Sequence, residues 1–481
     1  MGIKKNILYT SVLTTSNYLF PLIIYPYVSR VLGVENIGLC NFIDSVINYF
    51  ILISMMGVNI MGTRQIAIDK AQDQSLNKAF SSLLWLTFIT TAIAFILLII
   101  LTYSIKELNE NKDLMWYGAI KLVSNFLLIE WFYKGIEEFK FITIRTLIVK
   151  IIYIVFIFLL VKERKDYSIY YLLSVLMITA NAIINISYSR HFASFVVRLV
   201  SIKPYIKSFI ILGGYFFLTS LYTTFNIVYL GFVSNDTQVG YYTTAAKLYS
   251  ILLSLFSGVS TVIMPRMSNL LAQNKIEEFK SLLSKTTDYL FTFGIPLVIF
   301  TTILAPNIIY LISGPGYEGA TTPMRIIMPL MIIIGYEQIQ VIQCLMPLRK
   351  DKNIIINSGV GAVVGILLNL LLVKHLLAVG SAITWFIAEL SILVLSQIIM
   401  KRELNVNFPS KVFSKAVGSN LPLIFILILI YLPLRNYENV IVLGVCLVVT
   451  IIYFISVQLF ILKNPILEHY LFVVKNKFKR Y

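Results

Sequence analysis

The chain has 481 residues, of which 58% are hydrophobic and only 13% are charged. Soluble domains carry nearer one quarter charged residues, so this composition excludes a soluble enzyme and predicts a polytopic membrane protein. The net charge of +17 does not indicate nucleic-acid binding, because the lysines and arginines lie in short segments between apolar runs rather than in one basic patch.

Apolar runs of about 20 residues, the length that crosses a bilayer, recur along the whole chain. Read in order, they predict an all-α membrane protein with about 14 membrane-spanning helices. The predicted spans are 7–29, 37–61, 80–103, 114–134, 141–161, 169–190, 206–231, 239–264, 286–310, 323–346, 354–373, 378–400, 412–434 and 439–462.

The connections between these spans differ in their basic charge. With the N-terminus in the cytoplasm, the cytoplasmic connections hold about 28 lysines and arginines and the opposite connections about 9. This bias predicts that both termini are cytoplasmic and that the number of spans is even. All connections are short, which leaves no room for a soluble catalytic domain.

Two stretches of the chain share one layout. Gly38 follows a polar turn and an apolar run leads from it to Arg64, while Gly240 and Arg266 bound a similar run at the same spacing. This internal repeat predicts two lobes of six helices each, followed by two additional helices and a basic cytoplasmic tail. The predicted boundaries of these three parts are 1–200, 201–405 and 406–481.

No motif in the sequence indicates catalysis. There is no phosphate-binding glycine loop, no zinc-protease signature and no Ser/His/Asp grouping. The three cysteines and three histidines are dispersed, which argues against a disulfide framework or a metal site. We therefore expect a transporter rather than an enzyme, without a cofactor, driven by a Na⁺ or H⁺ gradient, the membrane potential or the substrate gradient.

Basic residues inside the predicted spans are the first candidates for function, because burying charge in a bilayer is costly. Lys121 and Lys247 lie within spans, and Arg30 and Arg325 lie at span ends on the outer side. Together these four predict a cationic cavity for a substrate that carries phosphate or carboxylate groups. The alternative for each is that its long side chain reaches the headgroups, and Lys150 is equally open to both interpretations.

Acidic residues inside the spans are the second group of candidates. Asp44, Glu337 and Glu389 predict either proton or sodium sites that couple transport, or counter-ions that neutralise the cavity lysines. Glu130 lies near the cytoplasmic end of its span and is expected to anchor a loop instead.

Three prolines interrupt predicted spans. Pro21 and Pro26 lie in the first span and Pro329 lies in the tenth. Because proline removes a backbone donor from a helix, we expect bends there that let helices flex during alternating access. The alternative is that membrane helices simply tolerate these prolines.

Several short motifs are spread over the chain. They are Asn17-Tyr-Leu-Phe-Pro21, Tyr25-Pro-Tyr-Val-Ser-Arg-Val-Leu-Gly33, Gly38, Gly57, Gly62-Thr-Arg64, Glu130-Trp-Phe-Tyr-Lys-Gly135, Gly240-Tyr-Tyr and Pro265-Arg266. In their order, and together with the chain length and the number of spans, they resemble the motifs of bacterial polysaccharide and O-antigen repeat-unit flippases. These proteins form a family within the multidrug/oligosaccharidyl-lipid/polysaccharide exporter superfamily.

The resemblance implies two six-helix lobes in a V around a central cavity, plus two C-terminal helices. It implies that undecaprenyl-pyrophosphate-linked oligosaccharides move from the cytoplasmic to the outer leaflet of the bacterial inner membrane by alternating access. The partners it implies are the lipid-linked oligosaccharide, membrane lipids, a polysaccharide polymerase and chain-length proteins. It would place Arg30, Lys121 and Lys247 in the cavity.

Other functions remain open at this point. A multidrug or cation antiporter of the same superfamily is expected to have an acidic, aromatic cavity, which the deep lysines argue against. A lipid II flippase would share the anionic substrate chemistry. A membrane enzyme such as a polysaccharide polymerase or ligase would need a large outer loop, and no connection in this chain is long enough.

Overall fold

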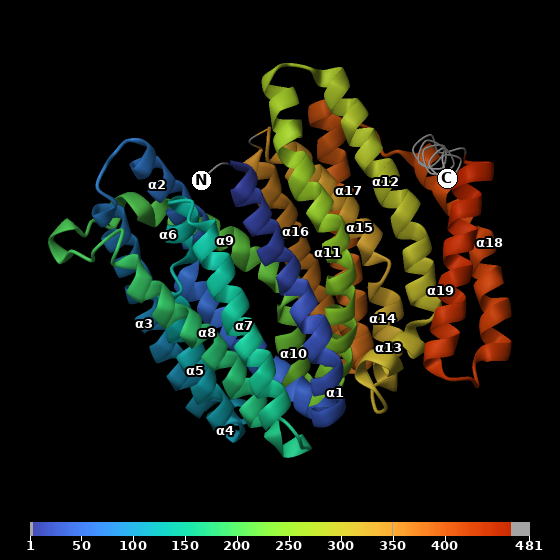
Figure 1. Cartoon of the computed structure of the whole chain (residues 1–481), viewed down its shortest axis with the longest axis horizontal. Coiled ribbons are helices and arrows are strands. Elements are labelled where there is room, and N and C mark those ends of the chain that lie inside the picture. The colour runs from blue at the N-terminus through green and yellow to red at the C-terminus, as the bar shows by residue number, and fades with distance from the viewer. Residues whose placement is uncertain (1–2, 349, 463–481) are drawn as a thin grey trace, which may run out of the picture. The chain divides into compact units, whose positions relative to one another are not determined.

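The computed structural model describes residues 3–348 and 350–462, and every regular element in these ranges is a helix (Figure 1). The predicted all-α class is therefore confirmed. The predicted basic tail, residues 475–480, lies outside the described ranges.

The contacts between residues group the chain into two compact units. The first unit contains residues 1–244 and 358–388, and the second contains 245–357 and 389–481. The predicted lobes, with boundaries at 200 and 405, rest on the internal repeat and stay a prediction.

The helices of the first unit are α1 (Ile3–Met55), α2 (Val58–Ala71), α3 (Leu76–Ser104), α4 (Lys106–Glu110), α5 (Lys112–Leu127), α6 (Glu130–Gly135), α7 (Phe139–Leu160), α8 (Tyr167–Ser189), α9 (Lys203–Thr223) and α10 (Phe225–Val233). The helices of the second unit are α12 (Ile276–Ile303), α13 (Ala305–Ser313), α14 (Thr321–Ile327), α15 (Leu330–Gln338), α18 (Ser410–Leu434) and α19 (Asn439–Ser456). Three helices contain a boundary between the units: α11 (Asp236–Ala272), α16 (Asp351–Leu368) and α17 (Lys374–Leu404).

Ten helical runs among the described residues are long and apolar enough to cross a membrane. Two of them, Leu8–Ala71 with 64 residues and Lys352–Leu404 with 53, exceed twice the length of about 20 residues that one crossing needs. Each of these two runs therefore has the length for more than one crossing. The chain is a multi-pass membrane protein, and the count of about 14 spans stays a prediction.

The backbone breaks helical geometry inside both long helices. In α1 the break is at Gly33, whose φ of 77° lies in the left-handed region that glycine adopts without a steric cost. This position falls in the connection between the first two predicted spans. In α17 the break is at Leu377, whose φ is 52°.

The three prolines differ in their effect on the helices. Pro329 lies between α14 and α15, so the helix is interrupted where a break was expected. Pro21 and Pro26 lie inside α1, whose backbone leaves helical geometry at Gly33 and not at either proline. Bending at these two residues stays a prediction.

The first unit is organised around α1, which contacts α3, α5, α7 and α10. Many other apolar side chains of these helices are exposed, as expected for helices that face lipid. In the second unit, α18 packs on α12, and α19 packs on α13 and α18. Its buried residues include Leu304, Leu423 and Val442.

The two glycines of the internal repeat lie against each other. A Cβ added to Gly38 would overlap the backbone carbonyl of Asp236, and one added to Gly240 would overlap the carbonyl of Val34. Each of these carbonyls belongs to the residue four positions before the other glycine. Three residues after each glycine, Asn41 Nδ2 donates to Thr243 Oγ1 at 3.0 Å. Equivalent positions of the two repeats therefore form the contact between α1 and α11, and a side chain would force these backbones apart.

Candidate functional site: an ion pair between α1 and α5

A carboxylate on α1 pairs with an ammonium on α5 inside the first unit. Lys121 Nζ lies 2.5 Å from Asp44 Oδ1. The Lys121 side chain is 10% exposed and the Asp44 side chain is 33% exposed. Two residues far apart in the sequence thus bring opposite charges together within helices that are otherwise rich in apolar residues.

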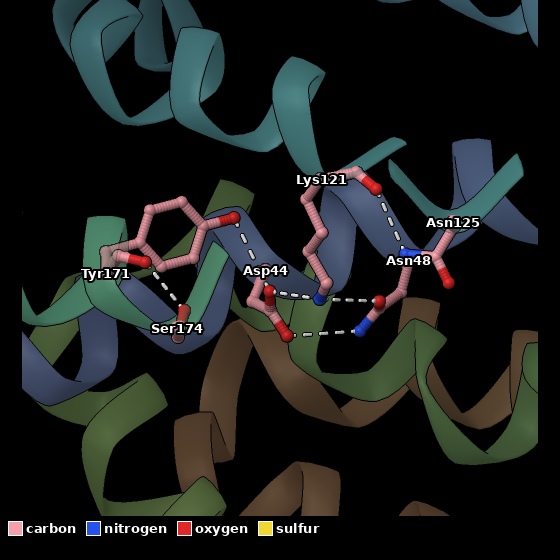
Figure 2. Close-up of polar contacts among 6 residues, drawn as sticks. All are labelled: Asp44, Asn48, Lys121, Asn125, Tyr171 and Ser174. Carbon is pink, nitrogen blue, oxygen red and sulfur yellow. Dashed lines mark hydrogen bonds and ion pairs between the residues drawn. The ribbon is translucent and has the colours of Figure 1, made fainter. Parts of the chain in front are cut away.

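Neutral polar groups complete the surroundings of the pair (Figure 2). Asn48, one helical turn after Asp44, accepts a hydrogen bond from Lys121 Nζ at 3.1 Å through Oδ1 and donates to Asp44 Oδ2 at 3.2 Å through Nδ2. The Tyr171 hydroxyl on α8 lies 3.4 Å from Asp44 Oδ1. Residues four apart share one face of a helix, so Asp44 and Asn48 both point at the same ammonium.

The pair is electrically neutral, and its two members differ in access to water. Removing both charges from water costs several kcal/mol each, and only short contacts with additional hydrogen bonds offset that cost. Lys121 can donate three hydrogen bonds and has two acceptors, Asp44 and Asn48. An anion that reached this site could use the third N–H or compete with Asp44 for the ammonium.

The other predicted cavity cations are on α1, α14 and α11. Arg30 is an exposed residue of α1, in the first unit. Arg325 is an exposed residue of α14 in the second unit, and its Nε donates to the Thr302 carbonyl at 3.2 Å. Lys247 is a half-buried residue of α11, also in the second unit. The cavity that these residues were expected to share stays a prediction.

Lys150, which was open to two interpretations, contacts α1. Its Nζ donates to Asn17 Oδ1 at 2.6 Å and to Ser16 Oγ at 3.3 Å. The ammonium also lies 5.2 Å from the centroid of the Phe20 ring. Lys150 therefore links α7 to α1 through neutral polar partners.

The two remaining acidic candidates lie in the second unit. Glu337 is on α15 and Glu389 is on α17, and their carboxyl groups hydrogen-bond to each other. Glu389 is buried. Asp44 thus has a cation as its partner, whereas Glu337 and Glu389 have each other.

Glu130 holds basic residues at the start of α6. Its carboxylate lies 3.4 Å from Lys134 Nζ and 3.8 Å from Arg145 Nη2. Arg145 is buried on α7, and the sequence analysis missed it because its charge was counted with the preceding basic connection. Its position four residues into the predicted span 141–161 was the signal that could have identified it.

Comparison with known proteins places these features in a family. The family model described as polysaccharide biosynthesis protein matches residues 3–271. The "Putative O-antigen transporter" of Escherichia coli (strain K12) is 26% identical over 400 residues, covering 81% of this chain and 94% of that protein. A protein of the same name from Shigella dysenteriae is 26% identical over 398 residues, covering 81% and 98%.

Solved structures agree with the fold. The lipid II flippase MurJ in an inward closed conformation matches with a TM-score of 0.76 and 16% identity, over 93% of this chain and 98% of that one. A multidrug resistance MATE family transporter of the MOP superfamily, in an inward-facing conformation, matches with a TM-score of 0.63 and 13% identity, over 83% and 99%. These proteins are named as transporters and flippases, not as enzymes. The predicted resemblance is confirmed, and because the family model covers more than half of the sequence, the chain belongs to the polysaccharide biosynthesis protein family.

Proposed function

We propose that the chain flips undecaprenyl-pyrophosphate-linked oligosaccharide repeat units across the bacterial inner membrane for surface polysaccharide synthesis. The observation that carries the proposal is the ion pair between the buried Lys121 and the partly exposed Asp44 in a chain of this family. A transporter for a pyrophosphate needs a cation that stays charged inside the membrane, and a nearby carboxylate keeps a lysine charged. The names of the two curated relatives support O-antigen as the polysaccharide class.

The proposed mechanism is alternating access with exchange of partners at Lys121. In the resting state Asp44 neutralises Lys121. When the pyrophosphate arrives, a phosphate oxygen takes over the ammonium, and Arg30, Lys247 and Arg325 contribute further positive charge. The lipid tail stays in the bilayer while the sugar headgroup crosses. Because charge-assisted hydrogen bonds to phosphate are strong, the substrate can replace Asp44 as the anionic partner of Lys121.

Ion coupling is the second part of the proposal. Protonation of Asp44 would remove its charge and release Lys121 for the substrate. Glu337 and Glu389, which lie next to each other in the second unit, are the proposed second site of proton coupling. We propose H⁺ as the coupling ion, with Na⁺ as the alternative.

The proposed setting follows from the same function. The termini would be cytoplasmic, as the distribution of basic residues predicts. A polysaccharide polymerase and chain-length proteins would act on the sugar units after they reach the outer leaflet, and are the proposed partners.

The test is flipping of a fluorescent undecaprenyl-pyrophosphate oligosaccharide in proteoliposomes. The wild type is compared with Lys121→Met, with Asp44→Asn/Lys121→Met, and with Lys106→Met as the control. Lys106 is an exposed lysine of α4 paired with Glu110, so its loss removes one charge but not the buried pair. We expect flipping to fall at least tenfold in both Lys121 variants and to be unchanged in the control. Wild-type rates in both Lys121 variants would exclude Lys121 as the headgroup site.

The same proteoliposomes separate the proposed function from its alternatives. The likeness to a lipid II flippase concerns the fold alone, and so does the likeness to a multidrug transporter. Lipid II and a cationic drug are therefore tested beside the oligosaccharide, with and without a pH gradient. Transport of lipid II or of the drug, without flipping of the oligosaccharide, would replace the proposed function. Equal flipping with and without Na⁺ and pH gradients would exclude ion coupling.

A further inference from the structure

A groove of about 580 Å³ lies beside the N-terminal end of α7 and the C-terminal end of α8. Lys140 and Arg145 line it with positive charge, and Phe141 and Tyr188 line it with aromatic rings. Further along α7 its walls are the aliphatic side chains of Ile144 and Ile148, among others. All these residues belong to the first unit, and none of them contributes to the Asp44–Lys121 pair.

Arg145 carries a buried guanidinium, two nitrogens of which lack acceptors in the described part of the chain. The residue is 5% exposed, and among the described residues its Nε and Nη2 find no hydrogen-bond partner. The nearest carboxylate oxygen, Glu130 Oε1, lies 3.8 Å from Nη2, which is an ion pair but too long for a hydrogen bond. A buried donor without an acceptor costs about 1–3 kcal/mol, and more when it is charged. Two guanidinium nitrogens thus lack acceptors within the described protein, and Arg145 is also one of the residues that line the groove.

The charges around the groove do not cancel. Glu130 is shared between Arg145 and Lys134. Glu138 and Lys140 also line the groove, one with each sign. Three cations and two carboxylates leave one positive charge in excess, to which the N-terminal end of α7 adds a partial positive charge. A ligand with a single negative charge would neutralise this excess.

The groove is charged near the N-terminal end of α7 and apolar further along the helix, so its polarity matches that of an amphiphilic molecule. Lys140 and Ile148 are eight positions apart, which is about 12 Å along a helix. Ile144 is 43% exposed and Ile148 is 52% exposed, so the apolar end is open to the surroundings. Between the two ends, Phe141 and Tyr188 stack with ring centroids 3.9 Å apart, the kind of aromatic pair that lies at the level of lipid headgroups.

We propose that this groove binds an anionic phospholipid of the surrounding bilayer. Its phosphate accepts hydrogen bonds from Arg145 and Lys140, and one acyl chain lies along Ile144 and Ile148. The excess of one positive charge selects phosphatidylglycerol over zwitterionic phosphatidylcholine, since the latter brings a cation as well as a phosphate. This lipid site is separate from the site of the transported substrate. The proposal therefore does not depend on which substrate the chain carries.

The experiment measures lipid retention by native mass spectrometry after delipidation and addition of phosphatidylglycerol or phosphatidylcholine. The variants are Arg145→Gln and Ile148→Trp, and the control is Val155→Trp. Val155 is 50% exposed on the same helix and does not line the groove, so it matches Ile148 in exposure and in the added bulk. We expect the wild type and Val155→Trp to retain phosphatidylglycerol in preference to phosphatidylcholine. Both groove variants should lose about tenfold in phosphatidylglycerol affinity.

The outcome for Ile148→Trp keeps the proposal testable even if Arg145→Gln folds poorly. Equal retention of the two lipids by the wild type would overturn the proposal. Undiminished phosphatidylglycerol binding by Ile148→Trp would also overturn it. Retention of an undecaprenyl-pyrophosphate oligosaccharide in place of phosphatidylglycerol by the wild type and by Val155→Trp, and its loss in Ile148→Trp, would assign the groove to the transported lipid instead.

Discussion

Two buried cations of the first unit have opposite surroundings. The Lys121 ammonium on α5 has a carboxylate oxygen at 2.5 Å and an amide oxygen at 3.1 Å. The Arg145 guanidinium on α7 has its nearest carboxylate oxygen at 3.8 Å, and two of its nitrogens lack acceptors among the described residues. The difference shows that burial alone does not define the role of a charge. An anion that binds Lys121 has to replace a carboxylate, whereas an anion that binds Arg145 would supply acceptors that the described residues do not provide.

The neighbouring helices explain this difference. α1 presents Asp44 and Asn48 on one face, and the Oδ1 atom of each accepts a hydrogen bond from Lys121. α6 offers Arg145 one carboxylate, Glu130, which it also presents to Lys134. A guanidinium has five N–H donors and an ammonium three, so Arg145 needs more acceptors and has fewer.

The largest effect is expected from Asp44→Asn. This change leaves the buried Lys121 ammonium without its counter-charge, and we expect the free energy of unfolding to fall by about 3 kcal/mol. Adding Lys121→Met should restore most of that loss, because the unpaired charge is gone. Urea unfolding in detergent, followed by tryptophan fluorescence, measures both variants. A double variant as unstable as Asp44→Asn would show that the unpaired Lys121 ammonium is not the cause of the loss.

A smaller effect is expected from Arg145→Met in the same assay without added lipid. The change removes a charge that is costly to bury and also a weak attraction to Glu130 at 3.8 Å. These contributions oppose each other, so the free energy of unfolding should change by less than about 1 kcal/mol. A destabilisation as large as that of Asp44→Asn would mean that Arg145 is as well compensated as Lys121, and the contrast between them would fail.

The smallest effect is expected from Asp236, a carboxylate whose pKa is raised by burial and by a second acidic residue. Burial, and then the charge of Glu35, raise the pKa of Asp236 from 3.8 to about 6. Because the folded pKa is the higher one, the stabilisation is fully present below pH 3.8 and is lost as the pH rises through about 6. Asp236 is half-buried, so solvent screening keeps the effect small. Melting temperatures measured from about pH 4 to pH 7 should decline less steeply for Asp236→Asn than for the wild type. An unchanged slope would exclude Asp236 as the titrating group.

The sequence predicts the fold class better than it predicts the partners in the site. The length and apolarity of the runs identify a multi-pass membrane protein, and the motifs identify its family. Lys121 and Asp44 are both recognisable as charges within spans, but they are 77 positions apart, and only the packing of α5 on α1 makes them a pair. The burial of Arg145 was not predicted, because its span begins only a few residues earlier. So close to a span end, the sequence does not distinguish a buried charge from a charge in the connection.

The contact between Gly38 and Gly240 has a consequence for symmetry. A residue that touches its own counterpart is what a two-fold homodimer shows at its axis, where the interface is isologous. Here the counterparts are Gly38 on α1 and Gly240 on α11, each against the carbonyl four residues before the other. The two repeats thus meet inside a single chain in the manner of two identical subunits. Substitutions at residues 38 and 240 should therefore have equivalent effects, because a side chain introduced at either one displaces the helix that carries the other.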